Sequence, residues 1–194
     1  EETVEAAAAA PTASPRRRVG LLAADERGAE RLSELTVPDF MRTATGMGEL
    51  DRVLGGGIVS GSVVLLTGEP GIGKSTLLLQ ISDILCRNRR VLYISGEESR
   101  GQIKLRAQRL GTVGDELYIY TDPCVEKIIE ESMKIKPDIL IVDSIQTVYS
   151  DRVSSSSGSV TQVRETAAAL IAYAKSSDTS IILVGHVNKE GSIA

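Results

Sequence analysis

The feature that most limits what this chain can fold into is a glycine-rich octapeptide, Gly68-Glu-Pro-Gly-Ile-Gly-Lys-Ser75. It has the spacing G-x-x-x-x-G-K-S/T, and it stands between an apolar run at 63–67 and a densely apolar segment at 75–85. By average residue usage such a pattern arises by chance in about one chain per hundred of this length. A strand, a glycine loop and a helix in this order form a cradle for phosphate groups.

Each residue of this phosphate loop has a task in such a site. The glycines let successive backbone N–H groups point inward around the β- and γ-phosphates, and the helix N-terminus adds partial positive charge. Lys74 is expected to reach the terminal phosphates, Ser75 to ligate Mg²⁺ and Thr76 to contact the α-phosphate region. The ligand class is therefore a nucleoside triphosphate with magnesium. The predicted nucleotide-binding residues are Gly68, Glu69, Pro70, Gly71, Ile72, Gly73, Lys74, Ser75 and Thr76.

The rest of the chain repeats the alternation of strand and helix. The apolar pattern predicts further strands at 91–95, 117–120, 138–143 and 180–185, and helices near 99–110, 125–134 and 160–174. A shorter amphipathic helix within 45–57 ends at three glycines. Strands that are aliphatic throughout must be buried on both faces, which is typical of parallel sheets. The predicted fold is α/β, a P-loop NTPase with a mostly parallel central sheet flanked by helices on both faces.

Three acidic residues follow predicted strands, where an open α/β sheet collects its ligands. Asp143 ends the strand at 138–143 and fits the second magnesium-holding position, the alternative being a helix cap. Glu97 and Glu98 follow the strand at 91–95. Hydrolysis needs a carboxylate that orients water toward the γ-phosphate, so one of the two is the expected catalytic base. We predict Glu97 for this role, together with Lys74 as a catalytic residue, and helix capping for the other glutamate.

The single histidine, His186, ends the last predicted strand at the same sheet edge. It is either an ordinary surface or core histidine or a sensor whose contact differs between triphosphate and diphosphate. The sensor is the preferred interpretation. A Ser/Gly-rich stretch at 154–159, after Tyr149, is expected to be a mobile loop where a polymeric partner lies, or else a plain connector.

Composition excludes several classes of protein. The chain has 22 basic and 26 acidic residues and a formal net charge of −4, so it lacks the basic field of a nucleic-acid coat protein. Two cysteines and one histidine are too few for a closed zinc site, so no zinc is expected. The apolar runs are too short to span a membrane, and a soluble protein of the cytoplasm is expected. Residues 1–31, rich in Ala, Glu, Arg and Pro, are expected to form a disordered tail or linker.

Several blocks resemble the core of RecA-like ATPases, and more closely the RadA (Sms) family of bacterial DNA repair proteins. These blocks, spread over 32–194, are Thr45–Gly57, Gly68–Gln80, Ser95–Ser99, Asp143–Thr147, Gly158–Glu165 and Gly185–Gly191. The resemblance implies a DNA-stimulated ATP hydrolase that forms a hexameric ring, binds single-stranded or branched DNA and drives branch migration in DNA repair and recombination. It further implies the recombinase RecA as a partner, Glu97 as the water-activating residue, His186 as the sensor, and DNA-facing loops at 149–159 and after 186.

The chain also departs from that family. A four-cysteine zinc finger, a Lys-Asn-Arg-Phe-Gly motif and a Lon-protease-like domain are missing from this sequence, so 32–194 is expected to be an ATPase core that is incomplete at its C-terminus. We therefore expect this incomplete core to retain nucleotide binding better than ATP hydrolysis. The competing hypothesis is a RecA-like signalling or clock-type ATPase that acts on protein partners, because the first loop offers DNA only Tyr149, Arg152 and Arg164. A small-molecule kinase is disfavoured, since the sequence indicates no separate pocket for a phosphate acceptor.

Overall fold

The computed structural model describes residues 31, 33, 42–112 and 114–187. The predicted tail at 1–31 lies outside the described residues, apart from Arg31, and so do the domain boundary at 32 and the predicted DNA-facing loop from Asn188 onward. Within the described ranges, no helix is both long and apolar enough to cross a lipid bilayer.

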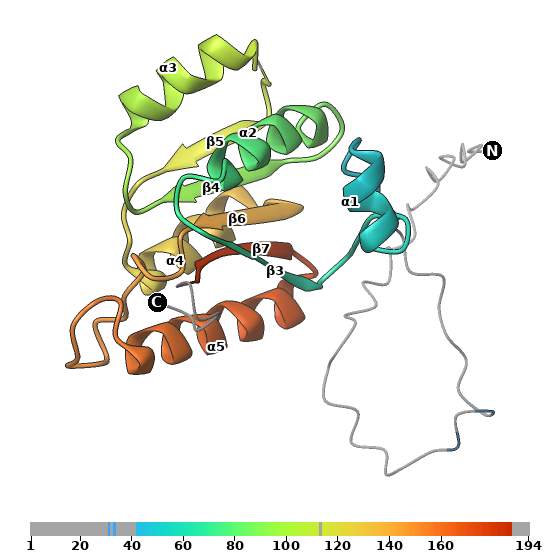
Figure 1. Ribbon diagram of the computed structural model, residues 1–194. Helices are drawn as coiled ribbons and strands as arrows, with labels where there is room; N and C mark the ends of the chain where they lie inside the picture. The colour runs from blue at the N-terminus through green and yellow to red at the C-terminus, as the bar shows by residue number, and fades with distance from the viewer. Residues whose placement is uncertain (1–30, 32, 34–41, 113, 188–194) are drawn as a thin grey trace, which may run out of the picture.

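A five-stranded parallel sheet forms the centre of the molecule, as the aliphatic strands predict (Figure 1). Every strand pair in it is parallel, so all five strands end at the same edge. This confirms the α/β fold with a mostly parallel sheet. In spatial order the strands are β3 (Val63–Gly68), β7 (Ser180–His186), β6 (Ile139–Asp143), β4 (Val91–Ser95) and β5 (Leu117–Tyr120).

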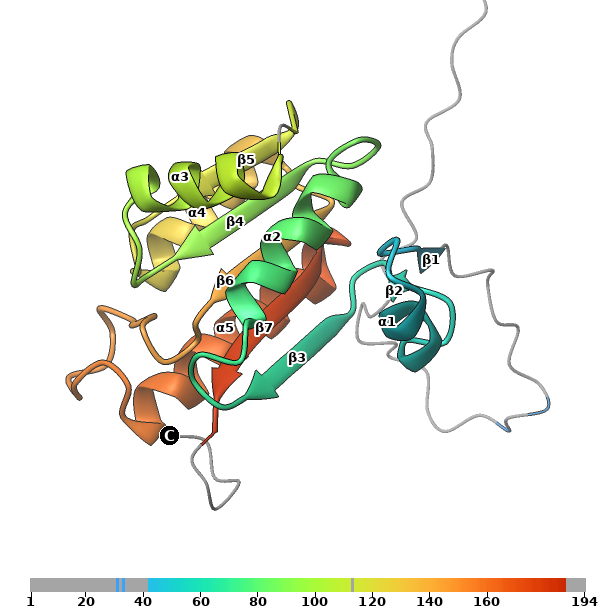
Figure 2. The same cartoon turned by 45° about the horizontal axis from the view of Figure 1, so that its top comes forward.

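Helices cover both faces of this sheet (Figure 2). One face carries α2 (Lys74–Leu85) and α3 (Arg100–Leu110), and the other carries α4 (Val125–Ile135) and α5 (Val160–Ser177). Every strand predicted from the sequence is found, with its ends within a residue of the expected positions. The helices agree equally well, except that α5 runs three residues beyond the expected Ala174.

The central strand β6 shows why the strands read as continuous apolar runs. Ile139 and Ile141 belong to the core beneath α2, whereas Leu140 and Val142 belong to the core beneath α4 and α5. All four side chains are almost fully buried. Successive side chains of a strand point to opposite faces, so a sheet covered on both sides needs an apolar residue at every position.

A small unit precedes the sheet. It consists of β1 (Arg42–Thr43), α1 (Gly48–Val53) and β2 (Ile58–Val59), with β1 and β2 antiparallel. The short helix was predicted, but strands of two residues carry too little pattern to be seen in a sequence. Gly57 closes the unit with a φ of 128°, and a Cβ atom there would lie 2.5 Å from the Thr43 carbonyl oxygen. Only glycine fits this close approach.

The central packing gives a stability prediction. Ile141→Ala should lower the free energy of unfolding by about 2–5 kcal/mol, because it leaves a cavity in the middle of the sheet. Leu105→Ala on α3, where the leucine is 61% exposed, should change it by less than about 0.5 kcal/mol. Urea unfolding followed by circular dichroism measures both. Equal losses in the two variants would contradict the assignment of Ile141 to the core.

Candidate active site

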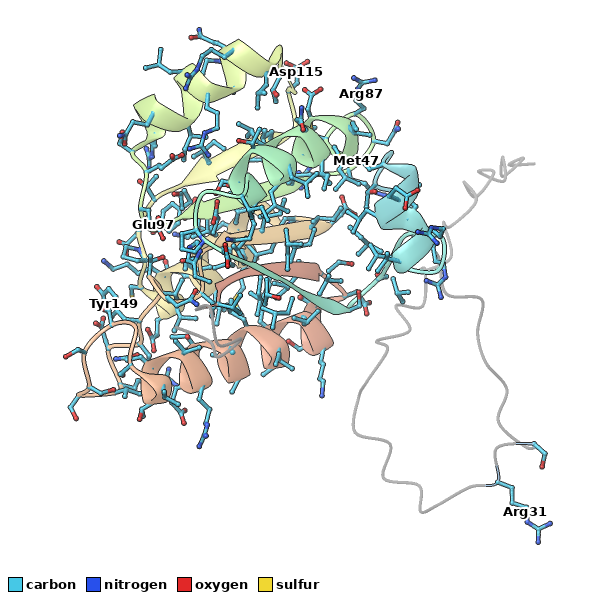
Figure 3. All side chains as sticks on the ribbon, viewed as in Figure 1. Arg31, Met47, Arg87, Glu97, Asp115 and Tyr149 are labelled. Carbon is cyan, nitrogen blue, oxygen red and sulfur yellow. The ribbon has the colours of Figure 1, made fainter. Side chains whose placement is uncertain are left out.

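Four strands bring the predicted site residues to one edge of the sheet. Gly68, the first residue of the phosphate loop, pairs with His186, and Ser95, two residues before Glu97, pairs with Asp143. The strand that precedes Glu97 therefore lies directly beside the strand that ends in Asp143, as the predicted base requires. Figure 3 shows Glu97 at this end of the molecule, well away from Met47 and Arg87.

The phosphate loop is shaped by glycines with positive φ. Gly71 has a φ of 79° and Gly73 a φ of 101°, which residues with a side chain rarely adopt. Gly73 is the N-cap of α2, and no side chain caps this helix, so the first-turn N–H groups keep their capacity for an anion. Lys74 is buried, and its Nζ donates to the carbonyl oxygens of Gly68 and Glu69 at 2.8 Å each. The ammonium thus lies within the curve of the loop.

The carboxylate of Asp143 is only 9% exposed and is held by a neutral donor. The hydroxyl of Tyr93, on β4, donates to Asp143 Oδ2 at 2.7 Å. Burial, reinforced by the neighbouring Asp143, raises the pKa of Tyr93 far above its ordinary value, so the phenol stays a donor. No other described residue forms a hydrogen bond or ion pair with the Asp143 carboxylate. Mg²⁺ prefers oxygen ligands, and the carboxylate of Asp143 and the hydroxyl of Ser75 fit that preference.

The two glutamates after β4 have different surroundings. Glu98 forms an ion pair with Arg106 of α3. The cap of α3 is not Glu98, as we expected, but Ser99, whose hydroxyl accepts from the Gln102 N–H while the Gln102 side chain accepts from the Ser99 N–H. The S-x-x-Q pattern of this capping box is readable in the sequence. Glu97 Oε1 accepts a hydrogen bond from Ser144 Oγ at 3.1 Å, whereas Oε2 has no partner among the described residues.

His186 lies next to Glu97. Its Nε2 is 3.5 Å from Glu97 Oε1, and its main-chain oxygen accepts a hydrogen bond of 3.0 Å from Gln146 Nε2. The Nδ1 atom of His186 is buried without a partner. The sequence analysis missed the contacts of Tyr93, Ser144 and Gln146. The last two stand in the Asp143–Thr147 block, which served there only as a mark of resemblance.

The chain is similar in sequence to a known protein family and to several known proteins. A family described as an AAA domain matches residues 29–192, which is most of the chain. The chain belongs to this AAA-domain family. Its relatives include proteins named DNA repair protein RadA. The Streptococcus pneumoniae R6 protein is 52% identical over 84% of this chain and 39% of its own length. The Pseudomonas aeruginosa PAO1 protein is 47% identical over 96% of this chain and 40% of its own length.

The RadA protein of Listeria monocytogenes EGD-e is 56% identical over 79% of this chain and 34% of its own length. These identities confirm the resemblance to the RadA family that the sequence blocks indicate. The AAA domain described here spans about two fifths of the length of the relatives it matches.

The polar loop of this AAA domain, defined here as residues 148–159, is fastened rather than free along its first half. The buried side chain of Gln162 accepts from the Ser150 N–H at 2.9 Å and donates to the carbonyl oxygens of Val153 at 3.0 Å and Ser155 at 2.9 Å. Tyr149 is held by its backbone, which donates to the Pro123 carbonyl oxygen at 3.0 Å. The Ser/Gly composition suggested mobility because Gln162, which fastens the loop, lies outside it on the following helix.

A second set of contacts joins the polar loop to α4. Ser150 Oγ donates to Glu126 Oε1 at 2.6 Å, and the Cys124 thiol donates to Glu126 Oε2 at 3.2 Å and lies 3.5 Å from Asp151 Oδ2. Burial raises the pKa of Cys124, so the thiol remains a donor. Both cysteines of the chain are buried and unbridged. The cluster therefore acts as a hydrogen-bonded attachment of the loop.

The buried phenol of Tyr93 gives a pH prediction. Above about pH 10 the unfolded chain loses this proton while the folded chain keeps it. The stabilisation is therefore complete below about pH 10, and the free energy of unfolding should fall by about 1.4 kcal/mol per pH unit above it. Tyr93→Phe should remove this slope, whereas Tyr118→Phe on the exposed edge strand should retain it. Urea unfolding between about pH 8 and 11 decides, and a slope unchanged by Tyr93→Phe would contradict the burial of an un-ionised phenol.

Proposed function

We propose that this chain binds ATP with Mg²⁺ and hydrolyses it, and that it forms the ATPase part of a DNA repair and recombination protein. The observation that carries the proposal is that Lys74, Asp143 and Glu97 meet at one edge of the sheet. Lys74 begins α2, Asp143 ends β6, and Glu97 follows β4. Membership of the AAA-domain family supports the use of ATP and magnesium.

Nucleotide binding is assigned to residues 68–76. Their backbone N–H groups surround the β- and γ-phosphates, and Lys74 leaves its carbonyl partners to place its charge on the terminal oxygens. Ser75 and Asp143 would hold the magnesium ion, which would neutralise charge on the phosphate oxygens. Tyr93 orients the Asp143 carboxylate through its hydrogen bond to Oδ2, so that this carboxylate would be a fixed oxygen ligand for the metal.

Glu97 is assigned the role of general base. Its Oε1 is engaged by Ser144, so the partnerless Oε2 is the oxygen that accepts a proton from water. The water oxygen then bonds to the γ-phosphorus, and the bond to the bridging oxygen breaks to give ADP and phosphate. Glu98 is unsuited to this role because Arg106 binds its carboxylate. His186, beside Glu97, is the proposed sensor of the γ-phosphate.

Three substitutions test these roles. Lys74→Ala should weaken ATP–Mg²⁺ binding by about ten- to hundred-fold, because hydrogen bonds from a charged group to phosphate are lost. Glu97→Gln should bind ATP normally but lower kcat by about 10²- to 10⁴-fold, since an amide cannot accept the proton. Glu98→Gln is the matched control and should lower kcat far less. Titration calorimetry and phosphate release measure these effects.

Two results would overturn the assignment. Undiminished ATP binding by Lys74→Ala would remove the basis of the nucleotide site. A larger loss of kcat in Glu98→Gln than in Glu97→Gln would exchange the roles of the two glutamates.

The proposed biological role follows from the relatives, which are named DNA repair proteins. By similarity to them, we propose that the chain acts on single-stranded or branched DNA in the cytoplasm and drives branch migration. A hexameric ring and the recombinase RecA as a partner belong to the same proposal. The names of the relatives favour this role over that of a signalling ATPase acting on protein partners.

An open depression at the same end of the sheet supports strand binding. Tyr120 and Tyr149 supply aromatic surfaces on which bases can stack, and Arg100 has no ion-pair partner among the described residues. Lys127 is tied to Asp122 at 2.8 Å, so its charge is largely compensated. Stacking therefore contributes more than phosphate neutralisation, and a weak salt dependence is expected. The depression is lined by Arg100, Tyr120, Thr121, Asp122, Pro123, Lys127 and Tyr149.

This surface predicts the effect of removing one aromatic ring. Tyr149→Ala should weaken the binding of a fluorescent oligo-dT strand by about 5- to 100-fold, the cost of one lost stacking partner. Tyr118→Ala, an exposed tyrosine outside the depression, should leave the affinity within about two-fold. Fluorescence anisotropy at two salt concentrations measures both. If the two substitutions had equal effects on affinity, the DNA strand would not bind in this depression.

A further inference from the structure

A groove between α3 and β5 takes no part in the proposed nucleotide site. It has a volume of about 400 Å³. Its apolar lining comes from α2, α3 and β5 and consists of Leu79, Ile103, Ala107, Leu117 and Ile119. The first three belong to one buried cluster, and the two residues of β5 pack against this cluster while staying partly exposed. The groove is therefore a part of the core that reaches the surface.

The groove runs beside the free edge of β5. This strand pairs with β4 along one edge, and no described strand pairs with its other edge. A strand in this position presents unpaired N–H and C=O groups. Proteins often protect such an edge with charged residues or proline, but β5 reads Leu-Tyr-Ile-Tyr and contains neither. An extended segment can therefore join the sheet here and direct every second side chain into the groove.

The helix α3 supplies positive charge to one wall of the groove. It has four cationic residues and no acidic residue. Arg106 forms an ion pair with Glu98, but the side chains of Arg100 and Lys104, which line the groove, have no hydrogen-bond or ion-pair partner among the described residues. Lys104 follows Arg100 by one helical turn, so both lie on the same side of α3. Two uncompensated cations beside an apolar lining favour a ligand with both carboxylates and apolar side chains.

The charges also give the groove a direction. Arg100 lines both this groove and the depression that contains Tyr120, the last residue of β5. Asp115 lines the groove two residues before β5 begins at Leu117. The basic end of the groove therefore lies where β5 ends, and its acidic end lies where β5 starts. Antiparallel pairing is slightly more stable than parallel pairing, which places the N-terminal part of an added strand at the basic end.

Nucleic acid fits this groove less well than it fits the depression at Tyr149. None of the described residues that line the groove is aromatic, so no base can stack there. The carboxylate of Asp115 repels phosphate, and the cations are confined to one end, whereas a nucleic-acid backbone carries a charge at every nucleotide. The groove therefore suits a ligand whose charge is local and whose remaining side chains are apolar.

We propose that the groove binds an extended segment of a partner protein as an additional strand, antiparallel to β5. The segment carries acidic residues at its N-terminal end, beside Arg100 and Lys104, and apolar side chains at every second position, beside Leu117 and Ile119. Main-chain hydrogen bonds to β5 supply affinity, and the groove supplies specificity. This surface goes beyond the proposed function, because it lies apart from the phosphate loop and does not depend on nucleotide.

A synthetic peptide tests the proposal on the full chain. The probe is a fluorescein-labelled octapeptide, Asp-Glu-Val-Thr-Val-Thr-Val-Thr, and its control has lysine in place of both acidic residues. Fluorescence anisotropy should show saturable binding of the acidic peptide with a dissociation constant below about 1 mM, and binding of the control should be weaker by about ten-fold or more. Nuclear magnetic resonance should show shifted amide signals for Leu117–Tyr120 and unchanged signals for the phosphate loop.

Two substitutions on α3 form a matched pair. Lys104→Glu should weaken binding of the acidic peptide by about ten-fold or more, because it places a carboxylate beside the acidic end of the peptide. Arg109→Glu changes the net charge equally, but Arg109 does not line the groove, so the affinity should change less than about two-fold. Arg109 also lies in the last turn of α3, where a cation stabilises the helix. A loss of helix stability would therefore affect this control at least as much as Lys104→Glu.

Several outcomes would overturn the proposal. They are a lack of saturable peptide binding up to about 1 mM, equal effects of the two substitutions, and amide shifts that leave out β5. If the peptide does not bind and Lys104→Glu instead weakens oligo-dT binding by about ten-fold, the groove binds nucleic acid. If Lys104→Glu instead abolishes self-association of the chain in sedimentation, the occupant is a second copy. ATP binding, measured by titration calorimetry in each variant, should stay unchanged, so the proposed function is tested separately.

Discussion

The parallel pairing of β3, β7, β6 and β4 is the constraint on which the site depends. Parallel strands end at the same edge, so the residues that follow β3, β4, β6 and β7 must meet there, although they lie more than a hundred positions apart in the sequence. The α2 helix begins at this edge and adds the partial positive charge of its N-terminus. Helices on both faces keep the strands buried, which fixes the register and thereby sets Gly68 beside His186 and Ser95 beside Asp143.

The charged groups of the site are held in a way that leaves them available to a ligand. Lys74 is hydrogen-bonded by two carbonyl oxygens and Asp143 by a phenol, so neither has a counter-ion among the described residues. A buried charge without a counter-ion is costly. Neutral donors and acceptors reduce this cost and fix each side chain in place, but they do not cancel the charge. The result is a preorganised pair of opposite charges that a magnesium-bound triphosphate can complement, the kind of electrostatic arrangement that phosphoryl transfer requires.

Most of the fold was predictable because its signals are local. The strands are short apolar runs, the phosphate loop is one contiguous motif, and even the cap of α3 is written as Ser99 followed by Gln102, although we assigned it to Glu98. What could not be predicted depends on contacts between distant segments. The sequence does not reveal that Tyr93 of β4 reaches Asp143 on the neighbouring strand β6, or that Gln162 organises a loop that its composition made look mobile. The pairing of β1 with β2 involves two residues on each side, too few for any periodicity.

Chain connectivity places the proposed nucleotide site and the proposed strand-binding depression close together. Tyr149 follows Asp143 by only six residues, and a chain of that length spans at most about 20 Å even when fully extended. Between these two residues, Ser144 contacts Glu97 beyond the end of β4, and Gln146 contacts His186 at the end of β7. A polymer bound at Tyr149, as proposed, is therefore only six residues along the chain from Asp143, the proposed magnesium ligand. The same short connection exists in any fold in which a magnesium-binding carboxylate ends a strand and the loop that follows binds a polymer.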